Sequence, residues 1–121
     1  MKRPEQQLQR TIAAYLRMML PPDVFFTAFP AGGGGKARGA QLKAMGLAPG
    51  VPDLMFIHNG KTRWVELKSA TGRVSDVQHE TFCRLYTAGC GNVVVCKSLE
   101  DVIATLKSWA IPVRLNVRVA A

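Results

Sequence analysis

The sequence predicts a three-layer α/β domain with a central mixed β-sheet flanked by helices. Three observations lead to this fold class. Apolar residues recur at helical spacing near the N-terminus, short apolar runs bounded by turn residues follow, and a helical stretch joins the last two of these runs. The predicted order is helix, strand, helix, strand, strand, helix, strand and helix. A hairpin followed by a helix–strand crossover combines antiparallel and parallel pairing in one sheet.

The first half of the chain contains two predicted helices with a strand between them. Residues 5–20 form the first helix, which follows Pro4 and ends at two consecutive prolines. Residues 24–29, VFFTAF, have the composition of a short strand. After the flexible PAGGGG loop, residues 36–46 predict a second helix that ends at a glycine. We expect the aromatic side chains of this region to belong to the core, namely Tyr15, Phe25, Phe26 and Phe29.

A β-hairpin is predicted in the middle of the chain. The turn sequence LAPGVP leads into the strand 53–58, DLMFIH. The next residues, NGK, are typical of a tight turn, and the strand 62–68, TRWVELK, follows them. The two runs are therefore expected to pair in antiparallel fashion.

The second half predicts a helix–strand–helix unit. Ser75 can cap a helix over residues 76–88. The run 92–96, NVVVC, is almost wholly apolar, which predicts a central strand covered on both faces. Ser98 can cap the final helix, LEDVIATLKSWA, and Pro112 prevents its continuation.

Length and composition are those of a single globular domain. The chain has 121 residues, of which 48% are hydrophobic and 20% charged. We expect one domain over residues 1–121, with a core over about 5–110. The tail 111–121 alternates apolar and polar residues and could form an edge strand, whose partner the sequence does not identify.

The charge balance predicts a polyanionic partner. Sixteen basic residues against eight acidic ones give a formal net charge of +8 and a pI near 9.9. Through Lys43 there are seven basic residues and two acidic ones, so the N-terminal third is the expected region of electrostatic contact. A basic surface without a specific partner is the alternative interpretation.

Several classes of protein are disfavoured by the sequence. The three cysteines have no C-x-x-C spacing, which argues against a zinc site or a disulfide framework. There is no signal-peptide-like start and no apolar run of the ~20 residues that cross a bilayer. We expect a soluble intracellular protein, in a bacterial or phage-infected cytoplasm or a nucleus, with no membrane partner and no small organic cofactor. The GGGGK stretch lacks two required positions of a phosphate-binding P-loop.

The hairpin carries the residues with the clearest chemistry. Residues two apart on a strand share a face, so Glu66 and Lys68 are expected to project together. Asp53 opens the neighbouring strand and can lie beside Glu66. Two carboxylates suit Mg²⁺ or Mn²⁺, which prefer oxygen ligands, and a nearby lysine can orient water or offset phosphate charge. This set could support metal-assisted hydrolysis of a phosphodiester.

Taken alone, this D-x₁₂-E-x-K pattern is weak, because chance spacing and a surface ion pair can produce it. Its context is more specific: GVPD, then WVELK, then Gln78 at the start of the following helix. This arrangement resembles the PD-(D/E)xK nuclease superfamily. The segment G46-LAP-G50-VPDL and the glutamate in the first helix resemble its virus-type replication–repair nuclease (VRR-NUC) branch. The resemblance runs from about Glu5 to Leu106.

The resemblance implies a restriction-endonuclease-like core and a set of site residues. Asp53 and Glu66, with the Leu67 backbone carbonyl, would bind the divalent metal. Lys68 would help to activate the attacking water. Two residues from other elements would support the site, namely Gln78 and Glu5.

The resemblance also implies DNA as the substrate, plausibly branched DNA such as Holliday junctions, and a homodimer like the resolvases that act on them. From their positions, three basic residues are candidate phosphate contacts, namely Lys36, Arg38 and Arg73. Two other functions remain open. A non-catalytic nucleic-acid-binding module with the same fold would show the same basic excess, and the residues alone do not separate DNA from RNA.

Overall fold

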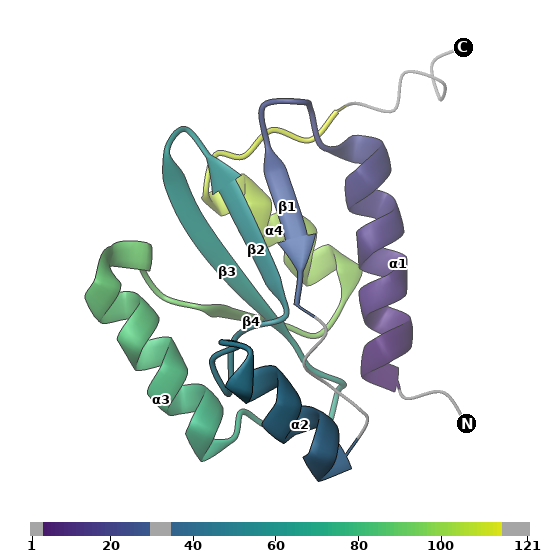
Figure 1. The fold of residues 1–121 in the computed structure, drawn as a ribbon. Coiled ribbons are helices and arrows are strands. Elements are labelled where there is room, and N and C mark those ends of the chain that lie inside the picture. Colours follow the sequence, from purple (N-terminus) through teal and green to yellow (C-terminus); the bar gives the residue numbers. More distant parts are fainter. Residues whose placement is uncertain (1–3, 30–34, 115–121) are drawn as a thin grey trace.

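The computed structural model describes residues 4–29 and 35–114, and it contains a four-stranded sheet with the order β1-β2-β3-β4 (Figure 1). The bounds of the strands are β1 Phe25–Ala28, β2 Leu54–His58, β3 Lys61–Leu67 and β4 Val94–Cys96. The first three strands pair antiparallel, whereas β3 and β4 are parallel. The sheet is therefore mixed, as predicted.

Helices cover the sheet in the expected three layers. Their bounds are α1 Pro4–Met19, α2 Gly35–Ala44, α3 Asp76–Leu85 and α4 Leu99–Ser108, and α3 ends in a wider helical turn, η1, at Tyr86–Cys90. In Figure 1, α1 and α4 pack beside each other on one side of the sheet, while α3 lies on the other. None of the helices within residues 4–29 and 35–114 is long and apolar enough to cross a membrane.

Strand alternation separates the core from the opposite face of β3. Val65 and Leu67 are buried with residues of α1 and α4, including Ile12, Leu16 and Leu106. Glu66, the residue between them on β3, points the other way, toward α3. The main hydrophobic core thus forms between the sheet and the α1–α4 layer, and polar groups can collect on the α3 side.

The predicted hairpin is present and its register is fixed by its turn. Asn59 and Gly60 have φ angles of 52° and 74°, the two positive values that a two-residue type I′ turn requires. Leu54 pairs with Val65, and His58 pairs with Lys61. This register places Asp53, the residue before β2, opposite Glu66, the residue after Val65.

Two predictions about the strands β4 and β1 are wrong. The strand predicted over 92–96 as central is the edge strand of the described sheet, and its Val95 is 37% exposed. An apolar run determines neither the number of neighbours that a strand has nor whether both of its faces are covered. Phe25, expected in the core, is 57% exposed, because it begins the opposite edge strand, β1.

Residues 111–114, the described part of the C-terminal tail, run from the end of α4 to the end of α1. Ile111 is buried in the core, and the backbone N–H of Arg114 donates to the Met19 carbonyl at 2.7 Å. Residues 111–114 are not part of a strand. The rest of the predicted edge strand lies outside the described residues.

The loop before β2 packs closely against α3 at Gly50. Gly50 has φ +76°, and a Cβ atom there would lie 2.7 Å from the Val77 carbonyl oxygen. The Thr81 hydroxyl donates a hydrogen bond to the Pro49 carbonyl in the same loop. Glycine at position 50 thus allows the loop backbone to approach the first turn of α3 closely, which fixes where β2 begins.

We expect Gly50→Ala to lower the free energy of unfolding by about 2 kcal/mol or more. A side chain at positive φ costs roughly 1–2 kcal/mol, and the collision with Val77 adds to it. Gly60→Ala is the matched control, since Gly60 has φ +74° and nothing within 4 Å of the added Cβ. Urea unfolding of both variants measures the difference. Equal losses would contradict the close contact with α3.

Candidate active site

The end of β3 presents an acid and a base on the face opposite the core. Glu66 is 2% exposed and Lys68 is 8% exposed, so both charged side chains are buried. The Lys68 Nζ lies 3.3 Å from Glu66 Oε2. The backbone N–H of Lys68 donates to the Cys96 carbonyl on β4, which holds the chain in an extended conformation past the end of β3. The predicted common direction of Glu66 and Lys68 is confirmed.

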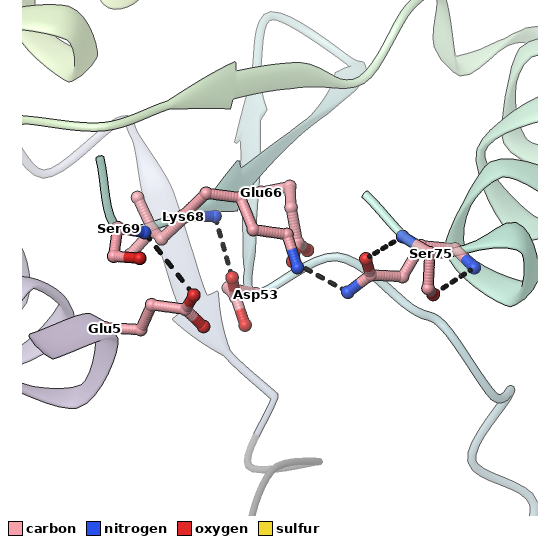
Figure 2. Close-up of polar contacts among 8 residues, drawn as sticks. Glu5, Asp53, Glu66, Lys68, Ser69 and Ser75 are labelled. Atoms are coloured by element: carbon pink, nitrogen blue, oxygen red, sulfur yellow. Dashed lines mark hydrogen bonds and ion pairs between the residues drawn. The ribbon is translucent and has the colours of Figure 1, made fainter. Parts of the chain in front are cut away.

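Asp53 reaches this pair across the hairpin. The hairpin register places Asp53 opposite Glu66, and its Oδ2 accepts a 2.7 Å hydrogen bond from the backbone N–H of Leu67. The Asp53 carbonyl accepts a bond from the N–H of Phe29 at 3.0 Å, which ties it to β1 as well. Two neighbouring strands therefore fix this carboxylate beside Glu66 (Figure 2).

Gln78 links the site to the start of α3. Its Nε2 donates to Glu66 Oε2 at 2.9 Å. Its Oε1 accepts from the Ser75 N–H at 2.9 Å, and its own N–H donates to Ser75 Oγ at 3.2 Å. The last two bonds form a capping box. One side chain thus both caps the helix and holds Glu66.

Glu5 enters from the first turn of α1. Its Oε2 accepts a 3.4 Å hydrogen bond from the N–H of Ser69. A Cβ at Gly72 would lie 2.8 Å from the same oxygen, so this loop packs closely on the carboxylate. Figure 2 shows Glu5 beside Asp53. Burial is the largest cause of the raised pKa of Asp53, and the negative charge of Glu5 adds to it.

Burial and the repulsion between neighbouring carboxylates raise the pKa values of Asp53 and Glu66. Burial raises the pKa of Glu66 to about 7, and the charge of Asp53 adds to this rise, while the Lys68 ammonium opposes it. Burial also raises the pKa of Asp53 above its ordinary value, against the lowering effect of the Leu67 N–H and Lys68. The corner of the fold that contains Glu5, Asp53, Glu66 and Lys68 has three carboxyl groups and one ammonium group. It therefore has an excess of negative charge that a bound cation would offset.

The atoms present fit a hard divalent ion. Glu66 Oε1 is buried and has no hydrogen-bond partner among the described residues. Because the N–H and C=O of one strand residue project to the same side, the Leu67 carbonyl faces the side of Asp53. The described residues contain no group of three or more histidine, cysteine or acidic side chains that could hold a metal. An ion here would use two carboxylates, a carbonyl and water, which is a common set for Mg²⁺.

Comparison with solved structures shows a likeness in shape to a known protein. The chain is similar to a protein described as "VRR_NUC domain protein", with a TM-score of 0.69, 19% sequence identity and coverage of 93% of each chain. The chain therefore has the same fold as this protein. The resemblance read from the sequence is thereby confirmed at the level of the fold. Neither the protein-family models nor the curated proteins gave a match to the sequence.

The VRR_NUC-like fold brings five of the predicted site residues together. They come from α1, the loop before β2, the end of β3 and α3, and they are Glu5, Asp53, Glu66, Lys68 and Gln78. Arg73 is exposed in the loop that also contains Gly72, and so lies near Glu5. Lys36 and Arg38 are exposed on α2.

Sequence reasoning missed residues that hold the acids in place. Ser75 was expected only as a helix cap, yet its bonds to Gln78 also orient the side chain that contacts Glu66. Ser69 and Gly72, which contact Glu5, were not expected to have a role. The S-x-x-Q spacing of a capping box was a readable signal for Ser75, whereas nothing local marks the contact between Gly72 and Glu5.

The raised pKa of Glu66 predicts how stability depends on pH without divalent metal. The folded pKa of about 7 exceeds the ordinary value of 4.5, so the folded chain holds this proton more tightly. The associated stabilisation is complete below about pH 4.5 and is lost as the pH rises through 7. Chemical unfolding in EDTA from pH 4 to 8.5 measures it.

Glu66→Gln is the comparison, because the amide does not titrate. We expect the difference in unfolding free energy between variant and wild type to move in favour of the variant as the pH rises through this window. Parallel pH profiles for the two proteins would show that Glu66 has no raised pKa.

Proposed function

We propose that the chain is a divalent-metal-dependent endonuclease that hydrolyses phosphodiester bonds in DNA. The observation that carries the proposal is the buried Glu66 carboxylate, with one unpartnered oxygen, beside Asp53 and Lys68. Structural charges normally have their hydrogen-bonding capacity filled, so an orphaned buried oxygen calls for a ligand. The likeness to a VRR_NUC domain protein supports a nuclease rather than another use of this corner.

The proposed metal ligands are Asp53, Glu66 and the Leu67 carbonyl, with Mg²⁺ or Mn²⁺ as the ion. When bound, the ion would polarise the scissile phosphate and make a water more acidic. Lys68 would orient the attacking water and offset the negative charge that develops on the phosphate. Its ammonium already lies beside Glu66, within the same buried corner.

Two further residues have supporting roles in the proposal. Gln78 keeps Glu66 in one orientation through its Nε2 donor, which leaves Oε1 for the ion. Glu5 adds a third negative charge next to Asp53, which favours cation binding and can accept a hydrogen bond from water. Both act on groups that the proposed reaction uses.

The basic residues outside the cluster are the proposed contacts to DNA phosphates, namely Lys36, Arg38 and Arg73. Branched DNA such as a Holliday junction is the proposed substrate form. A homodimer is proposed because one site cuts one strand, so paired incisions need two sites. A solution mass of a single chain, unchanged by DNA, would contradict the dimer.

The second candidate is a nucleic-acid-binding module without turnover. The net charge of +8 favours it as much as it favours a nuclease. Salt-sensitive DNA binding with no cleavage under any divalent ion would support this module. Metal-dependent nicking would exclude it.

Cleavage assays with Asp53→Asn and Glu66→Gln test the nuclease. Each change keeps the shape but removes a metal-binding charge, so we expect cleavage to fall at least about 100-fold, since losing even an outer-shell partner costs about 10- to 100-fold. Branched and linear DNA are incubated with Mg²⁺, Mn²⁺ or EDTA. Glu80→Gln, the same change at an exposed acid on α3, should cleave normally. Cleavage in EDTA, or by Asp53→Asn at the wild-type rate, would overturn the mechanism.

Gln78→Glu separates the two uses of Gln78. A glutamate can still accept the Ser75 N–H, so the cap survives, but it cannot donate to Glu66 and brings a like charge. We expect near-normal stability, with cleavage lowered about 10- to 100-fold. Ser75→Ala should lower the free energy of unfolding by about 1 kcal/mol and should reduce the cleavage rate less than Gln78→Glu does. Both are measured by thermal unfolding and cleavage rate; the reverse ranking would show that Gln78 is only a cap.

A further inference from the structure

Helix α2 is set apart from the rest of the fold. It has no buried residue, and Leu42 is its one partly buried side chain. No described element packs extensively against it, whereas α1 and α4 contact the sheet and each other, and α3 continues into η1, which contacts β3. A helix that is polar on nearly all sides is rarely stable alone, and binding of a partner is one source of stabilisation.

One face of α2 is basic. Lys36, Gly39, Ala40 and Lys43 have the i, i+3, i+4, i+7 spacing that places residues in one row. All four are exposed, and no ion pair or hydrogen bond engages either lysine side chain within the described ranges. At 1.5 Å per residue the lysines are about 10 Å apart along the axis, with only small side chains between them.

The helical period places Arg38 elsewhere. It lies two residues after Lys36, or about 200° around the helix, and so on nearly the opposite side. Lys36 and Arg38 cannot therefore serve one strand of DNA from one face of α2. The structure pairs Lys36 with Lys43 instead, a residue that sequence reasoning counted only as part of the net charge.

The position of α2 relates this face to the candidate site. The chain enters α2 after Phe29 and leaves it toward Asp53, and those two residues are hydrogen-bonded to each other. Figure 1 shows α2 at the end of the sheet where α1 and α3 begin, which is the end that contains Glu5 and Gln78. No acidic residue occurs between Asp23 and Asp53 in the sequence.

We propose that the Lys36–Lys43 face of α2 binds the sugar–phosphate backbone of duplex DNA next to the cleaved bond. The inference rests on the proposed function for its substrate. Charge complementarity identifies DNA as the partner of this face, because the face has two cations and no acid. The site beside it is acidic and would repel DNA unless nearby cations compensate. The lysine side chains are long and flexible, so two of them about 10 Å apart along the helix axis can both reach phosphates of one strand.

DNA binding measured in EDTA tests the proposal apart from cleavage. Fluorescence anisotropy with a labelled duplex is recorded over a range of salt for wild type, Lys36→Gln/Lys43→Gln and Lys61→Gln/Lys107→Gln. The control removes the same charge from two exposed lysines on other elements, β3 and α4. We expect the slope of log K against log salt to become shallower by about 1.8 only in the α2 variant, at about 0.9 per lost phosphate contact.

Ala40→Glu and Ala40→Gln give a second, isosteric pair. The glutamate places a negative charge between the lysines and should weaken binding at least tenfold relative to the glutamine, although both residues are good helix formers. Circular dichroism checks that α2 stays helical. Equal binding by this pair, or equal slopes for the two lysine variants, would overturn the inference.

The outcomes also separate this inference from the nuclease proposal. Binding that depends on Lys36 and Lys43, without cleavage under any divalent metal, would support the α2 surface and reject the nuclease. Metal-dependent cleavage lost in Asp53→Asn, with binding unaffected in the α2 variants, would do the reverse.

Discussion

The Glu66 carboxylate, buried almost completely on the α3 side of β3, is the constraint on which the rest of the site depends. A buried acid is unfavourable unless its oxygens are satisfied. One oxygen is satisfied twice, by Lys68 two residues along the chain and by Gln78 from α3. The other has no partner among the described residues. The fold therefore concentrates negative charge where only a cation, or a proton, can balance it.

Short contacts connect the elements around Glu66 to one another. The hairpin fixes Asp53 through the N–H of Leu67, and Gly50 presses the preceding loop onto the first turn of α3. That same turn is capped by Ser75 and Gln78, which returns the contact to Glu66. These connected contacts hold the acids in position before a substrate binds. Catalysis by positioning and electrostatics requires such pre-organisation.

Acidic and basic groups have separate places in this molecule. The acids that would hold a metal lie in one buried corner, whereas many of the sixteen basic residues are exposed. A polyanion approaching the corner is repelled by the carboxylates unless a metal ion and nearby cations compensate. Helix α2, little packed and joined directly to the Asp53 loop, is suited to provide cations at a short distance from that corner.

The sequence by itself determined the element order, the hairpin and the direction of Glu66 and Lys68, because these follow from periodicities of 3.6 and 2 and from an Asn-Gly turn. The family resemblance added Glu5 and Gln78, which no local pattern links to the hairpin. Only the tertiary structure decided that β4 is an edge strand, that Phe25 is exposed and that Gln78 caps α3 while holding Glu66. Each of these depends on how elements pack or turn in space, and residues close in sequence do not record that.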